Sequence, residues 1–335
     1  MKNNDQSVSI ITVTYNTKEF FPEYIESIFS GSVKPKEVLL YDGGSKDGTV
    51  ELINKYKKKY PEIKLFSGRN IGFAAGNNLL AKRATGHFLF ILNPDTKIDQ
   101  SCLISLLNNQ KRETSLLMPR RYLFDGSFLH HGMGLDIFGY PSDGKIFFAD
   151  GAAIFLTKKL FIDLGRFDPD YFMFQEDIDL SWRAHLNDVA LVTAKEAVIY
   201  HYSGGATKSG GIKSNSNKYT TNTFKRYLGE RNVLLNILKN YSTFSLIVIL
   251  PLVLVFNLLE IIFFTFTLNF KLASCYIKAY AWIFSHFPAV LKKRKVVQTS
   301  RKVSDFHIIK KMSLFNSKLI YFLKYGFKYG IPKIK

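Results

Sequence analysis

Between Val8 and Met118 the sequence repeats one pattern that constrains the fold more than any other feature: short apolar runs alternate with amphipathic stretches. The runs are VSIITVTY, EVLLYD, IKLFS and HFLFILN, and segments of helical periodicity separate them (residues 18–30, 48–60 and a segment from Gly72). Strands that alternate with helices predict βαβ units and a parallel sheet. We therefore expect an α/β domain that binds ligands at the carboxyl ends of its strands.

Polar residues follow three of these runs, where that edge of the sheet would lie. They are Thr14-Tyr15-Asn16, Asp42 and Asn93-Pro94-Asp95. Asp42 opens a glycine-rich turn, whereas Asp47 in the same turn is explained by capping of the next helix. Asp95 can bind a divalent metal, because magnesium usually takes one or two carboxylates and completes its shell with phosphate oxygens. A polar turn after a strand is the alternative for Asp95.

The segment SGRNIGFAAGNN places Arg69 just before a helix that opens on glycine. A helix N-terminus and an arginine both favour a phosphate group. A simple loop-to-helix turn is the alternative. A dinucleotide-binding Rossmann domain is excluded, because no G-x-G-x-x-G follows the first strand.

The next part of the chain predicts fewer regular elements. Residues 120–145 are rich in glycine and predict loops, and the spacing of His130 and His131 indicates no site. ADGAAIFLT predicts a strand and residues 158–165 a short helix. VALVT and AVIYH predict two last strands, followed by HYSGGATKSGG as a loop.

QEDIDLSWRAHL predicts a helix that begins at an acid pair, Glu176 and Asp177. The helix dipole favours the charged form of these acids, whereas burial in a substrate cleft would raise the pKa toward the range of a general base. Complementation of the dipole by acids in a first turn is the alternative. His201, at the end of the last predicted strand, is a metal or phosphate ligand or a structural histidine.

Six segments occur together in a known order: VSIITVTYN, YDGGSKDGT, NIGFAAGNN, FLFILNPDT, ADGAAIFLTKKLFIDLGRFDPDYFMFQEDIDLSWR and HYSGGAT. Over residues 8–235 the chain resembles glycosyltransferase family 2, and most closely its bacterial rhamnosyltransferase-like branch, which builds O-antigens and other surface polysaccharides. The resemblance implies a GT-A catalytic domain with a Rossmann-like mixed sheet over residues 1–235. Residues 236–335 would then form a helical, membrane-associating region.

The resemblance also implies roles for individual residues. The nucleotide and its ribose would be held by Thr14, Tyr15, Asp42 and Arg69. Asn93 and Asp95 occupy the metal and diphosphate motif, usually Asp-x-Asp, and His201 would lie near the same metal, Mg²⁺ or Mn²⁺. Asp177 would be the general base of an inverting single displacement, supported by Glu176. The implied donor is a dTDP- or UDP-linked sugar, with rhamnose as one option. A lipid-linked surface glycan as the acceptor is a hypothesis motivated by the apolar and basic last third of the chain.

Two residues depart from the family pattern. Asn93 stands in place of the first acid of the metal motif, which lowers the negative charge and weakens the expected dependence on metal. Gly43 stands where many members carry a second Asp, and this leaves the choice of donor open.

The last third of the chain is apolar and then basic. TFSLIVILPLVLVFNLLEIIFFTFTLNF is long enough to span a bilayer, which takes roughly 20 residues, but Pro251, Asn257 and Glu260 interrupt it. LASCYIKAYAWIFSHFPAVL is amphipathic and suits an interface. We favour an interfacial hairpin over a span; a buried helical core or a homodimer interface is the alternative.

The charge favours a membrane over nucleic acid as the partner. The net charge is +19, and residues 289–335 hold thirteen Lys or Arg against one acid, Asp305. Basic residues beside an apolar segment favour an anionic cytoplasmic leaflet, and no nucleic-acid-binding signature is present. Two cysteines and an N-terminus without an apolar run favour the cytoplasm. We expect a peripheral or monotopic protein on the cytoplasmic face of the inner membrane.

Two other functions remain as alternatives. One is a sugar-1-phosphate nucleotidyltransferase, but such enzymes carry a basic glycine-rich loop after the first strand, where this chain has TYNTKEF. The other is a catalytically inactive membrane scaffold that binds sugar or nucleotide. The presence of both Asp95 and Asp177 argues against a scaffold.

Overall fold

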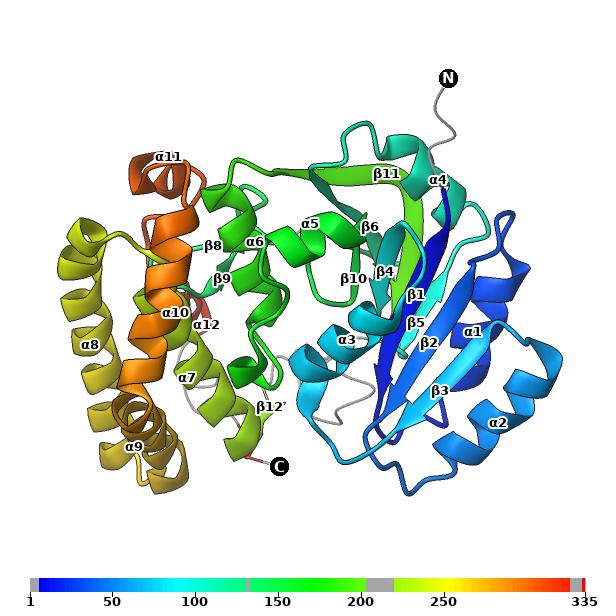
Figure 1. Cartoon of the computed structure of the whole chain (residues 1–335). Coiled ribbons are helices and arrows are strands. Elements are labelled where there is room, and N and C mark those ends of the chain that lie inside the picture. Colours follow the sequence, from blue (N-terminus) through cyan, green and yellow to red (C-terminus); the bar gives the residue numbers. More distant parts are fainter. Residues whose placement is uncertain (1–5, 131–132, 203–219, 326–332, 335) are drawn as a thin grey trace. The chain divides into compact units, whose positions relative to one another are not determined.

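The computed structural model describes residues 6–130, 133–202, 220–325 and 333–334. These residues form two compact units. The first unit draws on Met1–Gly132, Ala149–Ala184 and Val189–Thr207, and the second on Met133–Phe148, His185–Asp188 and Lys208–Lys335. Figure 1 labels their elements. The predicted domain boundary at residue 235 stays a prediction.

The first half of the first unit is built as the repeating pattern predicts. Four strands pair in parallel in the order β3-β2-β1-β4, namely Ile63–Ser67, Glu37–Asp42, Val8–Thr14 and Phe88–Leu92. The helices between them are α1 (Phe21–Ser30), α2 (Thr49–Lys59) and α3 (Gly72–Arg83). The prediction of βαβ units is confirmed.

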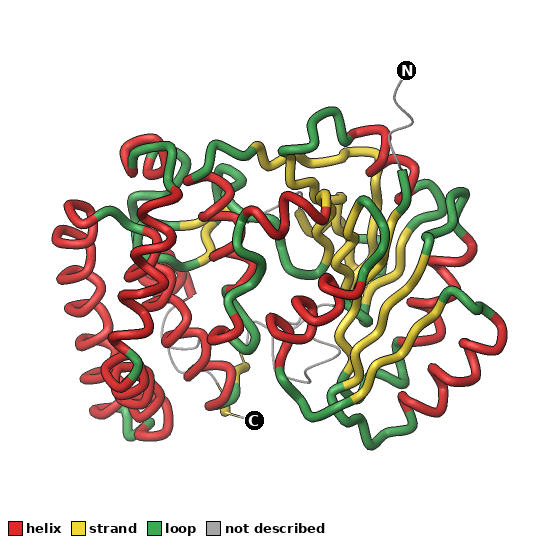
Figure 2. The backbone as a smooth tube through the Cα atoms, viewed as in Figure 1, coloured by secondary structure: helices red, strands yellow, loops and turns green. Residues whose placement is uncertain are grey.

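Beyond β4 the sheet becomes mixed. Its order continues β10-β6-β11-β5, and β7 pairs with β6 (Figure 2). These strands are Ala153–Thr157, Ser115–Leu123, Ala190–His201, Thr96–Ile98 and Phe128–His130. Strand β10 is antiparallel to β4, and β5 is antiparallel to β11. The mixed sheet that the resemblance implied is therefore confirmed.

Two predictions in this half of the sheet are wrong in part. Residues 120–123 are strand and not loop, because β6 continues beside β11 through Arg120 and Arg121, whose charges hid the strand in the sequence. VALVT and AVIYH are one strand, β11, with a register shift between Ala194 and Val198. The exposed charged residues of this bulge made a single bent strand look like two.

Helices cover both faces of the sheet, because its strands bury apolar side chains alternately on each side. Alternate residues such as Ile10 and Leu40 pack against α1, α2 and α4 (Cys102–Asn109). Their neighbours in the sequence, such as Ile11 and Leu39, pack against α3, α5 (Lys158–Asp163) and α6 (Glu176–Leu186). This packing fixes the strand ends on which the candidate site is built.

The second unit is mostly helical (Figure 2). Its helices are α7 (Thr223–Asn240), α8 (Thr243–Phe266), α9 (Phe270–Ser285), α10 (Phe287–Ser300), α11 (Asp305–Ile309) and α12 (Ser317–Tyr325). Two short strand pairs, β8–β9 (Gly134–Leu135, Pro141–Ser142) and β12–β13 (Thr220–Thr221, Lys333–Ile334), complete it. Among the described residues, α8 is the one helix that is long and apolar enough to cross a membrane.

Candidate active site

The carboxyl ends of β1 and β2 meet in a hydrogen-bonded turn around Asp42. Its Oδ2 accepts hydrogen bonds from Thr14 Oγ1 at 2.9 Å and Ser45 Oγ at 2.6 Å. Its Oδ1 accepts from the N–H groups of Gly44 at 2.9 Å and Ser45 at 2.8 Å. Thr14 and Asp42 are fully buried, whereas Tyr15 beside them is 46% exposed. Asp42 therefore organises the turn, and Tyr15 offers a side chain at its surface.

Arg69 lies at the end of β3, on the segment that leads into α3. Its side chain is exposed, and its carbonyl oxygen accepts a hydrogen bond from Tyr41 Oη at 2.8 Å. Asn70 Oδ1 accepts from the N–H of Gly72, the first residue of α3, at 3.0 Å. Arg69 thus stands beside a helix N-terminus, as expected for a residue that binds a phosphate.

A loop with left-handed backbone conformations contacts the start of α3. Phe172, Phe174 and Gln175 all have positive φ angles, of 61°, 70° and 71°, directly before the acid pair of α6. The carbonyl oxygen of Phe172 accepts a hydrogen bond from the N–H of Ala74 at 3.2 Å. Positive φ angles at non-glycine residues cost conformational energy and occur preferentially at functional sites. The loop links the start of α3 to the start of α6.

Gly72 makes this contact tolerable, and we expect Gly72→Ala to destabilise the protein. The φ angle of Gly72 is +79°, and an added Cβ would lie 2.4 Å from the carbonyl oxygen of Phe172. Left-handed backbone costs a non-glycine residue about 1–2 kcal/mol, and overpacking adds about 1–3 kcal/mol. Urea unfolding would measure the loss. Gly126→Ala is the matched control, because Gly126 has a φ of +82° and nothing lies within 4 Å of an added Cβ. Equal losses in the two variants would contradict the contact.

At the end of β4, Asp95 meets His201, which lies 106 residues further along the chain. His201 Nε2 lies 3.1 Å from Asp95 Oδ1, and both side chains are nearly buried. The strand pair β5–β11 brings them together: His201 pairs with Thr96, and the N–H of Tyr202 donates to the carbonyl oxygen of Asp95 at 3.1 Å. Asn93 is half-buried two residues earlier. The rest of the HYSGGAT segment lies outside the described residues.

The chemistry of this pair suits a divalent cation that a ligand helps to hold. A carboxylate and an imidazole are two protein ligands, and no cluster of three or more His, Cys, Asp or Glu with the geometry of a metal site occurs in the described residues. A cation at Asp95 and His201 would therefore need oxygens from a bound diphosphate, which is how magnesium is usually held in nucleotide sites.

The acid pair lies at the start of α6, and Asp177 is held by backbone donors. Its Oδ2 accepts a hydrogen bond from the N–H of Gly151 at 2.8 Å, and its Oδ1 accepts from the N–H of Ile178 at 2.8 Å. Glu176 is buried beside it, and Glu176 Oε2 has no hydrogen-bond partner among the described residues. A buried carboxylate oxygen without a partner marks a place where a ligand hydroxyl can bind.

A third carboxylate, Asp150, stands next to this pair and was not among the predicted site residues. Its Oδ2 lies 2.7 Å from Arg121 Nη1, and its Oδ1 accepts from the N–H of Ala152 at 2.8 Å. The signal in the sequence was an acid before glycine at the start of β10. This signal can be interpreted only once β10 is known to pair with β4. The N–H of Asn93 there donates a hydrogen bond to the carbonyl oxygen of Ala152 at 2.9 Å.

The electrostatics of the acid pair favour protonation. Burial raises the pKa of Asp177 to about 7, and the negative charge of Asp150 adds to the rise, while the N–H donors of Gly151 and Ile178 oppose it. Burial also raises the pKa of Glu176 well above its usual value, with Asp177 as the next cause. A carboxylate with a pKa near neutrality is suited to accept a proton in a reaction at physiological pH.

The chain is similar to known proteins, above all over its first half. A model of the family "Glycosyl transferase family 2" matches residues 9–179. A cholesterol galactosyltransferase of Borreliella burgdorferi is 32% identical over 108 residues, which is 32% of this chain and 30% of that protein. A poly-beta-1,6-N-acetyl-D-glucosamine synthase of Staphylococcus aureus is 24% identical over 195 residues, 54% of this chain and 46% of that protein. The chain thus spans less than half the length of these two curated relatives.

A solved structure extends the likeness to most of the chain. It is a mannosyltransferase from Pyrobaculum calidifontis in complex with GDP-mannose and Mn²⁺. The TM-score is 0.51 at 14% sequence identity, and the likeness covers 90% of this chain and 85% of that one. At this identity the likeness concerns the fold alone, and with the family match it supports the GT-A fold with a helical C-terminal region.

Proposed function

Because this chain belongs to glycosyl transferase family 2, we propose that it transfers a sugar from a nucleoside-diphosphate donor to a hydroxyl group of an acceptor. One observation carries the proposal. The turn Asp150–Ala152 is hydrogen-bonded on one side to Asn93, next to Asp95, and on the other side to Asp177. The carboxyl end of β4, where we propose that the diphosphate binds, and the carboxylate that we propose as the general base are thereby connected to the same three residues.

In the proposed reaction Asp177 takes the proton from the acceptor hydroxyl. The acceptor oxygen forms a bond to the anomeric carbon while the bond from that carbon to the diphosphate breaks, so the configuration inverts in one displacement. The electron pair of the broken bond leaves with the nucleoside diphosphate. Glu176, with its unpartnered Oε2, orients a hydroxyl of the acceptor or the donor sugar. A positioned general base of this kind contributes about 10²–10⁴ in rate.

A divalent cation, Mg²⁺ or Mn²⁺, would be held by Asp95 and His201 and would neutralise the charge that develops on the departing diphosphate. Asn93 stands next to this pair and offers an amide in place of a second carboxylate. Thr14, Tyr15, Asp42 and Arg69 form the proposed nucleotide side. Asp42 acts there through the turn that it organises, and Tyr15 and Arg69 through exposed side chains.

The finer identity of the substrates rests on resemblance and is part of the proposal. The resemblance favours a dTDP- or UDP-linked donor, with rhamnose as one option for the sugar. The apolar and basic last third of the chain favours a lipid-linked surface glycan as the acceptor. The Staphylococcus aureus relative is named for the synthesis of a polysaccharide, which fits a glycan acceptor. The apolar helix α8 and the basic C-terminal region support attachment to the cytoplasmic face of the inner membrane.

Calorimetric titration with UDP, dTDP, GDP and CDP, each with and without Mn²⁺ or Mg²⁺, tests the donor class. We expect one nucleotide to bind, and the cation to strengthen its binding because a cation bridges Asp95 and the diphosphate oxygens. Asp95→Ala should weaken that binding at least about tenfold in the presence of cation, since it removes one of two protein ligands. Asp99→Ala, at a half-buried position on the same stretch of chain, is the control. If none of the four nucleotides bound, the scaffold function would replace the enzyme.

A further inference from the structure

The most polar side chains of α8, Asn257 and Glu260, are buried or half-buried, whereas its exposed side chains are mostly apolar. Its buried residues recur every three or four positions and include Ser245, Ile249, Val253, Asn257 and Phe264. Its exposed side is apolar apart from Thr243 and Thr265 near the two ends of the helix. The exposed apolar residues are Phe244, Ile247, Val248, Leu252, Leu254, Val255, Leu258, Leu259, Ile262 and Phe266. A surface helix of a water-soluble protein has the reverse arrangement. We call this exposed set the α8 stripe.

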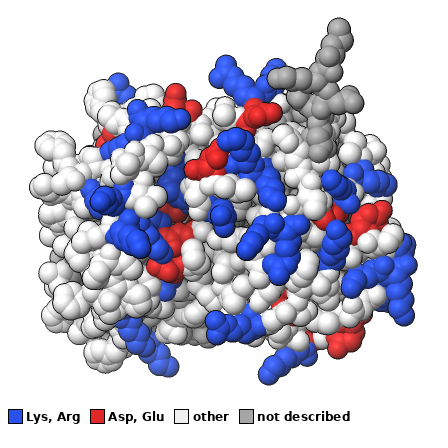
Figure 3. Space-filling model, viewed as in Figure 1, with Lys and Arg blue, Asp and Glu red and all other residues white. Residues whose placement is uncertain are grey.

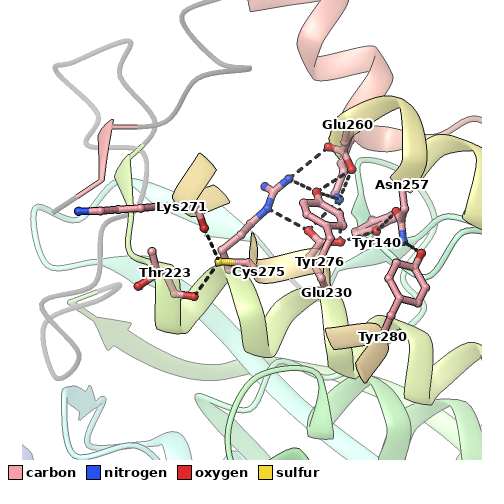
Figure 4. Close-up of polar contacts among 11 residues, drawn as sticks. Tyr140, Thr223, Glu230, Asn257, Glu260, Lys271, Cys275, Tyr276 and Tyr280 are labelled. Carbon is pink, nitrogen blue, oxygen red and sulfur yellow. Dashed lines mark hydrogen bonds and ion pairs between the residues drawn. The ribbon is translucent and has the colours of Figure 1, made fainter. Parts of the chain in front are cut away.

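The inner face of α8 is held by an ion-paired cluster (Figure 4). Glu260 Oε1 lies 3.2 Å from Arg226 Nη2 of α7, and Glu260 Oε2 lies 2.8 Å from Lys318 Nζ of α12. Lys318 also contacts both carboxylate oxygens of Glu230, at 2.8 and 2.9 Å. Burial acts to raise the pKa of Glu260, but Lys318 and Arg226 hold it below the usual value. The charge that interrupts the apolar run is therefore neutralised inside the unit.

Two further bonds fix the direction of α9 against α8. Tyr276 Oη donates to Glu260 Oε2 at 2.7 Å, and Asn257 Nδ2 donates to Tyr280 Oη at 2.8 Å. A later residue of α9 thus meets an earlier residue of α8, so the two helices run antiparallel. Exposed Lys278 lies between the two tyrosines in sequence and is therefore level with residues 257–260, in the second half of α8.

The position of Lys278 along α8 distinguishes a helix that spans the membrane from a helix that lies in its plane. If α8 crossed the hydrocarbon core, which is about 30 Å thick, α9 would lie inside the core beside it. Exposed Lys278 would then lie within the hydrocarbon core, where a charged lysine is costly. A helix that lies flat inserts its apolar face about 5–10 Å into the interface and leaves neighbouring lysines at the headgroups. Exposed Lys271 and Lys278 of α9, and Lys292 and Lys295 of α10, suit that level.

We propose that α8 lies in the plane of an anionic lipid bilayer surface, with the α8 stripe inserted and the ion-paired cluster holding its inner face to the protein. Charge selects this occupant over a second copy of the chain, because residues 289–335 carry thirteen basic residues and one acid. In Figure 3 the surface over α8, at the left edge of the view, is white, and blue Lys and Arg side chains lie beside it. This proposal rests on the membrane attachment that is part of the proposed function, and it is independent of sugar transfer, which can fail or hold without it.

Vesicle flotation of the full chain tests the surface. Wild type should bind vesicles of phosphatidylcholine with phosphatidylglycerol, and binding should weaken with salt and with omission of the anionic lipid. Val255→Asp and Ile247→Asp should each weaken binding at least about tenfold, because a charge replaces an inserted side chain. Ile162→Asp, at an exposed apolar position of α5 in the first unit, is the matched control. Unchanged binding in both stripe variants would overturn the proposal.

Depth measurements separate lying from spanning. A fluorophore on Phe244→Cys, Val255→Cys or Phe266→Cys would be quenched by lipids that carry a quencher at a shallow or a deep position. The two native cysteines, Cys102 and Cys275, are buried, and labelled wild type gives the background. We expect equal, shallow depth at all three positions; a deep Val255 between shallow ends would mean a span and overturn the proposal. Light scattering measures whether the chain forms a dimer through the α8 stripe. If Val255→Asp dissociated a dimer and left vesicle binding unchanged, the stripe would be an interface with a second copy of the chain, and this too would overturn the proposal.

Discussion

An Asp177→Asn variant is expected to lose about a thousandfold in turnover while its nucleotide affinity stays within about twofold of wild type. Asparagine cannot take the proton of the acceptor hydroxyl. It keeps the size of the side chain and one of the two backbone hydrogen bonds that hold Asp177, from Gly151 and Ile178. Sugar transfer to a hydroxyl acceptor and calorimetric nucleotide titration, measured on one preparation, would separate the two effects.

Two results would bear on the assignment of the base. Asp163→Asn, on the exposed surface of α5, should keep wild-type turnover and control for the loss of a carboxylate. If Asp177→Asn kept wild-type turnover, Asp177 would not be the base. If it lost nucleotide binding to the same degree as turnover, the residue would serve the donor and not the acceptor.

The turnover of the wild type should depend on pH through the same residue. The pKa of Asp177 is raised to about 7, so the rate should rise as pH increases through about 7 and the carboxylate becomes ionised. Asp150→Asn removes a neighbouring negative charge and should shift this rise to lower pH. A rate that did not change across neutral pH would contradict the elevated pKa.

Stability should respond to the same ionisation with the opposite sign. Because the folded-state pKa of Asp177 lies above its unfolded value, the stability from its protonated form is present at acid pH and is lost as pH rises through about 7. Asp177→Asn lacks this loss. Its free energy of unfolding, relative to wild type, should therefore be more favourable above pH 7 than at acid pH, which chemical denaturation at several pH values would measure.

The second large effect is expected at Lys318, whose replacement by methionine should destabilise the second unit by about 3 kcal/mol. Lys318 Nζ contacts Glu230 and Glu260 and lies 4.0 Å from the centre of the Tyr140 ring. Its loss leaves two acids beside the single guanidinium of Arg226. We expect a loss of stability at the lower end of the range for breaking a buried ion pair, because the Lys318 side chain is 20% exposed. Urea denaturation followed by near-ultraviolet circular dichroism would report the change.

A second substitution distinguishes lost pairing from lost packing. Lys318→Met combined with Glu260→Gln should recover part of the stability, because the uncompensated charge is removed along with the lysine. Lys295→Met changes the same chemistry at an exposed position of α10 and should stay within about 0.5 kcal/mol of wild type. Equal stability of Lys318→Met and Lys295→Met would mean that the cluster contributes little.

Much of the first half of the fold could be predicted because each element carries its own signal. The runs that became β1, β2 and β4 are almost continuously buried, as central parallel strands are. The polar residues after them could be assigned to one edge because parallel strands end together. Strand β6 was missed and the bent β11 was divided, since their partners come from distant segments and their charged residues look like loop.

The candidate site followed the same rule. Asp95 and His201 were singled out from their places at strand ends, and the structure brings them within 3.1 Å. Asp150 could not be found in this way, because its significance depends on the antiparallel contact of β10 with β4. The hydrogen bonds that Thr14, Gly44 and Ser45 donate to the Asp42 carboxylate could not be predicted from the sequence either. A carboxylate at a strand end gives the same sequence pattern whether it binds a ligand or stabilises a turn.

The pairing of β5 with β11 has a consequence for the order in which the protein folds. In the described part of the chain, β5 has β11 as its neighbour in the sheet, and β11 is the last strand of that sheet to leave the ribosome. The parallel strands β1 to β4 all lie within the first 92 residues and can pair earlier in synthesis. The turn that carries Asp95 gains its partner strand only when residue 201 has been synthesised. A nascent chain that stops earlier can thus hold a formed half-sheet in which Asp95 lacks its contact with His201.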